Sequence, residues 1–254
     1  MSALAWRAAG IAVVAALIAL WGEIATLKLI SPVFLPTPGR AWTALWNGFA
    51  RGDLGVKFLG TIEHMLGGWL VASIVGVALG ALIGSSAAAR AYIGPTLEFL
   101  RPLPASAVIP VAIAIFGLTP QMALGVIGFG SIWPVLLATM HGFAAVEPRL
   151  SEVERALGLS RWQGMAKISL PSAAPDILAG LRLGLTVSLI LAVVCEMIAG
   201  LDGLGQWVLL GARAYKSADI FAGVVLLGAI GVVANATLSL VEARALRWRA
   251  PNAR

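Results

Sequence analysis

Long stretches of this chain contain no charged residue. None lies between Glu63 and Arg90, and none lies between Asp219 and Glu242. Each stretch is long enough for one helix to cross about 30 Å of hydrocarbon, which takes about 20 residues. Of the 254 residues, 59% are hydrophobic and 12% are charged. This composition excludes an ordinary cytosolic enzyme, a disordered chain and a secreted disulfide scaffold. We therefore expect an all-α integral membrane protein.

Charge-free segments and the breaks between them predict about six transmembrane helices. The predicted spans are 9–29, 60–85, 97–118, 121–142, 177–200 and 219–242. Six spans leave both termini on one side of the membrane, and twelve of the eighteen Lys and Arg residues then lie on that side. The positive-inside rule predicts that this side is cytoplasmic. Arg182, near the cytoplasmic end of the fifth span, is expected either to extend its side chain to the membrane–water interface or to pair with Asp176.

Two patterns predict where particular helices pack. Gly76, Gly80 and Gly84 fall on one face of the second span, where a neighbouring helix can approach closely. After the first span, a short helix is expected from about Pro38, and its apolar stripe favours a position on the outer membrane interface. The stripe consists of Trp42, Leu45, Trp46 and Phe49.

The polar segment between the fourth and fifth spans predicts two short helices joined by a turn. Pro148 suits a first helical turn, and Gly158 suits the left-handed residue that ends a helix. Ser160 and Gln163 form a capping box that opens a second helix, which Pro171 and Pro175 are expected to end. Leu150, Val153, Ala156 and Leu157 make one apolar face on the first helix.

This loop resembles a known family. Its pattern Glu152-Val153-Glu154-x3-Gly158-x9-Ile168-x-Leu170-Pro171 is similar to the E-A-A-x3-G-x9-I-x-L-P loop of binding-protein-dependent ABC importer permeases. The segment Arg101-Pro102-Leu103-Pro104 resembles one found in the nitrate, sulfonate and taurine branch. The chain departs from the family at Val153-Glu154, where two alanines are usual, and at Ala138, where an Asn is common.

The resemblance implies a MetI-like permease fold and a defined set of partners. These are a cytoplasmic ABC ATPase dimer that holds ATP and Mg²⁺, a periplasmic or lipid-anchored substrate-binding protein, and a second permease subunit in a homodimer. It places the chain in a bacterial inner membrane and suggests a small anionic cargo such as a sulfonate, taurine or nitrate. Residues 1–59 would form the first transmembrane helix and a periplasmic amphipathic segment, and residues 60–248 the permease core with a coupling loop at 143–176. Residues implied to couple to the ATPase are Glu152, Val153, Glu154, Ala156, Leu157, Gly158, Ile168, Leu170 and Pro171.

The chain itself shows no sequence signature of catalysis. It has no Gly-Lys-Ser/Thr phosphate-binding motif, so ATP hydrolysis must come from a partner and the chain is expected to be a transport subunit rather than an enzyme. His64 and His141 have no partner at metal-ligand spacing, so no metal site is expected. No basic run suggests a nucleic-acid partner. Candidates for the substrate path are the polar residues inside apolar spans: Ser131, Thr139, Thr186, Ser188 and Asn235.

Three alternatives to an ABC importer permease of this branch are considered. An ion-coupled secondary transporter would need paired acids in mid-membrane and internal repeats, and neither is found. A membrane-embedded enzyme would need a clustered catalytic set, which the scattered acids and two histidines do not supply. An ABC permease of another substrate branch remains open. Glu196, near the outer end of the fifth span, is expected to act structurally at the interface or in gating.

Overall fold

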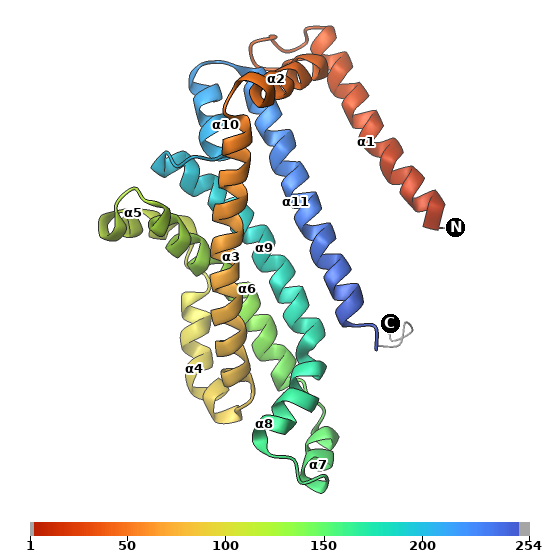
Figure 1. Ribbon diagram of the computed structural model, residues 1–254, viewed down its shortest axis with the longest axis vertical. Helices are drawn as coiled ribbons and strands as arrows, with labels where there is room; N and C mark the ends of the chain where they lie inside the picture. Colours follow the sequence, from red (N-terminus) through yellow and green to blue (C-terminus); the bar gives the residue numbers. More distant parts are fainter. Residues whose placement is uncertain (1–2, 249–254) are drawn as a thin grey trace. The chain divides into compact units, whose positions relative to one another are not determined.

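A computed structural model describes residues 3–248, apart from the side chains of residues 3–8, 11, 148, 151, 153, 155 and 161. Every regular element in this range is a helix (Figure 1). The elements are α1 (Ala3–Thr26), α2 (Pro38–Arg51), α3 (Leu54–Gly84), α4 (Ala87–Leu100), α5 (Ala105–Phe116), α6 (Pro120–Ala144), α7 (Pro148–Ala156), α8 (Arg161–Gly164), the π-helix η1 (Met165–Ser169), α9 (Leu170–Ala199), α10 (Leu204–Arg213) and α11 (Ser217–Ala245). The predicted all-α class is confirmed.

The chain divides into two compact units, which are described separately. The first unit comprises Met1–Gly60 and Asp202–Ala229, and the second comprises Thr61–Leu201 and Ile230–Arg254. Helices α3 and α11 each contribute to both units.

Four helices in the described range are long and apolar enough to cross a membrane. They are α3, α6, the continuous helix Trp162–Ala199 and α11. A fifth candidate is the bent pair of α4 and α5, and a shorter apolar helix, Ala12–Thr26, lies within α1. Each of the six predicted spans thus has an apolar helical counterpart, although the ends differ.

The third predicted span, 97–118, is wrong as a single straight helix. Helix α4 ends at Leu100 and α5 begins at Ala105, with an 86° bend between them. The physical reason lies in Pro102 and Pro104, which have no amide hydrogen to donate and which disfavour helical backbone in the residue before each.

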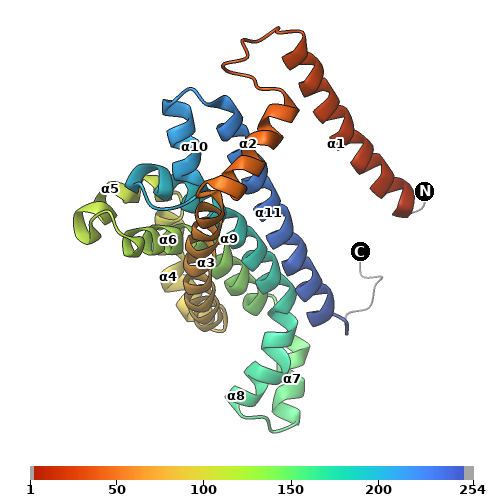
Figure 2. The ribbon, with the colours of Figure 1, turned by 45° about the horizontal axis from the view of Figure 1, so that its top comes forward.

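The core of the second unit is built where α6 packs against α9. Helix α5 packs on the same pair. Val126, Ile127 and Val135 of α6 are fully buried, as are Ala192 and Cys195 of α9. Helices α7 and α8 project beyond the ends of α6 and α9, and this is visible in both views (Figures 1 and 2).

The glycine stripe of α3 lies directly against α6, as its spacing predicts. A Cβ atom at Gly80 would lie 2.7 Å from the backbone oxygen of Leu136 and 2.7 Å from Cβ of Thr139. At Gly84 it would lie 2.7 Å from the backbone oxygen of Met140. Backbone atoms cannot move aside as a flexible side chain can, so the stripe sets the distance between the two helices.

Replacing Gly80 with Ala is expected to lower the free energy of unfolding by about 1–3 kcal/mol, because the new methyl group overpacks this contact. Gly94→Ala on α4 is the matched control, since a Cβ atom there has no other heavy atom within 4 Å. Denaturant titration of the purified variants in detergent measures both. Equal stability of Gly80→Ala and Gly94→Ala would contradict the close approach of α3 and α6.

The first unit is held by contacts between helix ends and loops. The indole nitrogen of Trp21 donates to the carbonyl of Pro36 at 2.9 Å, and the same ring stacks on Phe221 with centroids 5.1 Å apart. Lys57 is buried and pairs with Asp202 at 2.5 Å. The predicted helix from Pro38 is confirmed, with the Thr37 hydroxyl as its N-cap.

Candidate functional site

The loop after α6 folds into an elbow, formed by α7, the Gly158 turn and α8. Gly158 has a φ of +61°, in the left-handed region, and the amide of Leu159 bonds to the carbonyl of Glu154 at 3.1 Å. These two features form a Schellman turn, which ends α7. The predicted helix stop at Gly158 is therefore confirmed, and it depends on a residue without a side chain because other residues are strained at this φ.

The second half of the elbow begins with the predicted capping box. The amide of Ser160 donates to the side-chain oxygen of Gln163 at 2.9 Å, and the amide of Gln163 donates to the Ser160 hydroxyl at 3.4 Å. This reciprocal pair satisfies amides that the first turn of α8 cannot bond itself.

Pro171 and Pro175 do not end this helix, contrary to the sequence expectation. The chain is helical without a break from Trp162 to Ala199. The wider π turn of η1 precedes Pro171, and the amide of Leu170 bonds back to the carbonyl of Met165. Pro171 directly follows this wider turn, and the Ser172 hydroxyl donates to the carbonyl of Ile168 at 2.7 Å.

The tip of the elbow presents apolar side chains to solvent. Leu157 is 67% exposed and Trp162 is 80% exposed, while Glu152, Ala156 and Gly158 are also exposed. Trp162 was not among the residues implied by the family pattern, although a Trp in a polar loop between two spans could have indicated it. Large apolar side chains exposed together at such a turn are typical of a protein-binding surface.

Glu154, the departure from the usual alanine, lies against α8. A Cβ atom at Gly164 would be 1.9 Å from Oε1 of Glu154, so the carboxylate lies directly over this glycine. Glu154 is half-buried and Gly164 is buried. The larger side chain is therefore accommodated inside the elbow, between its two helices.

The remaining predicted coupling residues lie in or beside the π turn. Ile168 is in η1 and is half-buried; Leu170 is exposed, and Pro171 is half-buried at the start of α9. Val153 is in α7, and its side chain lies outside the described part of the chain.

The five candidates for the substrate path do not share one surface. Ser131, Thr139 and Ser188 are fully buried in α6 and α9, whereas Thr186 and Asn235 are exposed. The hydroxyl of Ser188 donates to the carbonyl of Leu185 at 2.7 Å, and that of Thr186 to Arg182 at 3.2 Å, so both bond to their own helix. Within residues 3–248, the hydroxyls of Ser131 and Thr139 have no hydrogen-bond partner.

A buried carboxylate joins α9 to α3. Glu196 is 0% exposed; its Oε2 accepts from the Thr61 hydroxyl at 2.9 Å, and its Oε1 lies 3.0 Å from Nδ1 of His64. Sequence patterns did not predict this cluster, because 132 residues separate His64 from Glu196. His64 also lines a cavity of about 210 Å³ with Glu63, Gly67, Pro120, Gln121 and Leu124.

Arg182 has a different partner from the one proposed on sequence. Its guanidinium pairs with Glu242 of α11 and donates to the Ser239 hydroxyl at 3.0 Å. Asp176 lies instead 3.7 Å from Nδ1 of His141. Helices α9 and α11 are therefore joined by an ion pair at this level of the second unit.

Comparison with known proteins agrees with this arrangement. Residues 72–247 match the family described as "Binding-protein-dependent transport system inner membrane component". The putative aliphatic sulfonates transport permease protein SsuC of Bacillus subtilis is 31% identical, over 94% of this chain and 87% of its own length. The taurine transport system permease protein TauC of Escherichia coli is 29% identical over 94% and 88%. The nitrate import permease protein NrtB of Synechocystis is 30% identical over 77% and 71%.

Solved structures share the fold. The MetNI methionine ABC transporter in an inward-facing conformation matches with a TM-score of 0.61 at 20% identity, over 76% of this chain and 94% of that one. An amino acid ABC transporter solved with histidines matches with a TM-score of 0.58 at 19% identity, over 79% and 92%. The expected MetI-like fold is confirmed, and the chain is a transport subunit rather than an enzyme. This chain belongs to the family of inner-membrane components of binding-protein-dependent transport systems, the permease subunits of ABC importers.

Proposed function

We propose that the elbow of α7 and α8 is the surface through which this permease is driven by a separate ABC ATPase. The observation that carries the proposal is the exposure of Leu157 and Trp162 on either side of the Gly158 turn, where α7 meets α8. Both side chains can be buried in a partner without desolvating a charge. The Schellman turn and the capping box stiffen the elbow, so a force applied at its tip would reach α9 through the continuous helix Trp162–Ala199.

The same proposal includes a homodimer and two further partners. Two copies of the chain would enclose a central path, and closure of the two ATPase subunits on ATP and Mg²⁺ would draw the two elbows together. A substrate-binding protein would dock on the opposite, outer side and release its cargo into the path. The charge distribution of the loops supports an orientation with both termini and the elbow in the cytoplasm.

The cargo we propose is a small anion of the sulfonate, taurine or nitrate type. Support comes from relatives whose names state aliphatic sulfonates, taurine and nitrate, each about 30% identical to this chain. Similarity at this level supports a shared substrate class rather than one compound.

Energy coupling provides the test. The tagged chain is purified from native membranes with its associated proteins and reconstituted into proteoliposomes with ATP and Mg²⁺ inside and the binding protein outside. We expect uptake of labelled taurine, ethanesulfonate or nitrate that requires ATP, and we expect Gly158→Arg to abolish both uptake and copurification of the ATPase. Uptake that follows an imposed proton gradient without ATP would contradict the proposal and favour an ion-coupled secondary transporter.

A further inference from the structure

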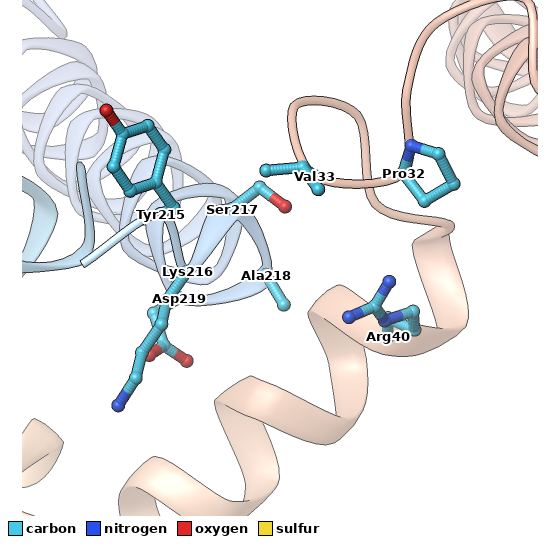
Figure 3. A pocket seen from close by; sticks show the side chains of 8 residues that line it. All are labelled: Pro32, Val33, Arg40, Tyr215, Lys216, Ser217, Ala218 and Asp219. Atoms are coloured by element: carbon cyan, nitrogen blue, oxygen red, sulfur yellow. The ribbon is translucent and has the colours of Figure 1, made fainter. Parts of the chain in front are cut away.

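A cavity of about 470 Å³ lies in the first unit (Figure 3). One wall comes from the segment between α1 and α2 and from the first turn of α2, with Pro32, Val33 and Arg40. The other comes from the turn between α10 and α11 and from the first turn of α11, with Tyr215, Lys216, Ser217, Ala218 and Asp219. We call it the Arg40–Lys216 cavity.

Its walls are equipped to hold an anion. Arg40 and Lys216 are exposed, and in the part of the chain that the structure describes neither lies within 4.0 Å of a carboxylate. Ser217 is only 6% exposed, its hydroxyl has no hydrogen bond to a residue in the described range, and Figure 3 shows the oxygen turned into the space that faces Arg40. The N-terminus of α11 adds the positive end of a helix dipole.

The cavity also holds one acid, which restricts the ligand further. The carboxylate of Asp219 lies on the same wall as Lys216. It would repel a simple anion, but it would attract an ammonium group carried by the same ligand. Two cations and one carboxylate therefore match a small zwitterion, in which a short chain joins an oxyanion to an ammonium group.

The position of the cavity indicates where such a zwitterion comes from. Helix α11 is long and apolar enough to span the membrane and begins at Ser217, so the cavity lies where a span starts. Trp42 and Trp46 of α2 are 66% and 65% exposed on one face of that helix. Exposed Trp side chains on an amphipathic helix are typical of the headgroup layer.

We propose that the Arg40–Lys216 cavity binds the phosphoethanolamine headgroup of a membrane lipid. Arg40 and the Ser217 hydroxyl contact the phosphate, and Asp219 contacts the ammonium group. The Lys216 ammonium, which Figure 3 shows turned away from Arg40, reaches the phosphate by rotation of its exposed side chain. A phosphatidylethanolamine headgroup and a soluble zwitterion such as phosphoethanolamine both carry an oxyanion joined to an aminoethyl group. The exposed Trp side chains of α2 and the position of the cavity at the start of α11 favour the lipid. The site uses neither the elbow nor the ATPase, so its test is independent of the proposed transport function.

Native mass spectrometry of the purified full-length chain tests this proposal. The protein is incubated with equal amounts of phosphatidylethanolamine and phosphatidylglycerol, and the lipid that remains bound is counted. We expect the wild type to retain phosphatidylethanolamine and Arg40→Gln/Lys216→Gln to retain roughly tenfold less, because two charge-assisted contacts are lost. Asp219→Asn should still bind lipid but lose the preference for phosphatidylethanolamine.

Arg51→Gln is the matched control, since Arg51 is an exposed cation on α2 outside the cavity. It should retain as much phosphatidylethanolamine as the wild type. Equal retention by the double variant would overturn the proposal. Displacement of the lipid by an equal concentration of soluble phosphoethanolamine would overturn the lipid assignment and give the cavity to a soluble zwitterion.

Discussion

Replacing Gly158 with Val is expected to release the ATPase from this permease. The backbone at Gly158 has a φ of +61°, where a residue with a Cβ atom is strained by about 1–2 kcal/mol and a β-branched residue by more. The turn would relax, and Leu157 would move away from its present position at the tip of the elbow. We expect the amount of ATPase that copurifies with the permease to fall at least about tenfold, the factor that about 1.4 kcal/mol represents.

Gly158→Asn is the control for this substitution. Asn adds a side chain at the same position but visits left-handed backbone readily, so the turn should persist. A Cβ atom at Gly158 meets no other heavy atom within 4 Å, so the first side-chain atom of either variant finds open space. Equal loss of the ATPase in both variants would mean that the side chain, rather than the turn, disturbs docking; no loss in either would contradict the role of the elbow.

Replacing Glu196 with Ala is expected to destabilise the second unit by about 1–3 kcal/mol, the usual cost of leaving a buried hydrogen-bond donor without its acceptor. The substitution removes the carboxylate that accepts from Thr61 and lies 3.0 Å from the His64 ring. It also leaves a void in a site that solvent does not reach. Denaturant titration in detergent gives the free energy of unfolding.

Glu98→Ala provides the comparison, because Glu98 is an exposed residue of α4 and undergoes the same chemical change. We expect its effect to stay within about 0.5 kcal/mol of the wild type. In a double-mutant cycle, His64→Ala should cost much less in the Glu196→Ala background than in the wild type. If Glu196→Ala were as stable as Glu98→Ala, the buried cluster would not hold α3 to α9.

Local patterns predicted those parts of the fold that local physics determines. Charge-free runs indicated the spanning helices because hydrocarbon cannot hydrate charges. Gly158 and the pair Ser160–Gln163 indicated the elbow, because backbone handedness and capping depend on a few adjacent residues. The spacing of Gly76, Gly80 and Gly84 indicated the contact with α6 for the same kind of reason.

The prolines show the limit of such rules. Pro102 and Pro104 break a predicted span, whereas Pro171 and Pro175 lie within one continuous helix. The difference arises because the π turn η1 widens the helix before Pro171 and the Ser172 hydroxyl bonds to the carbonyl of Ile168. The position of a proline in the sequence does not indicate a π turn beside it. Proline alone therefore indicates a possible break, and the surrounding hydrogen bonds decide it.

Contacts between distant residues were not accessible from the sequence. His64 with Glu196 and Arg182 with Glu242 join residues that are 132 and 60 positions apart. Their pairing depends on which helix faces pack together, and a single sequence carries no direct record of that. The residues that line the substrate path could not be predicted either. The polar residues inside the apolar spans divide between buried and exposed faces of their helices.

Site-specific cross-linking tests whether the elbow of α7 and α8 contacts an ABC ATPase. The photoreactive residue p-benzoylphenylalanine is placed at Leu157, on the exposed tip of the elbow, and in a separate chain at Trp42, an exposed position on α2. After illumination of native membranes, we predict a covalent adduct between the Leu157 position and a P-loop ATPase, identified by mass spectrometry, and no such adduct from Trp42. Adducts from Leu157 that contain only lipid, or an ATPase adduct from Trp42 alone, would contradict docking of the ATPase on the elbow.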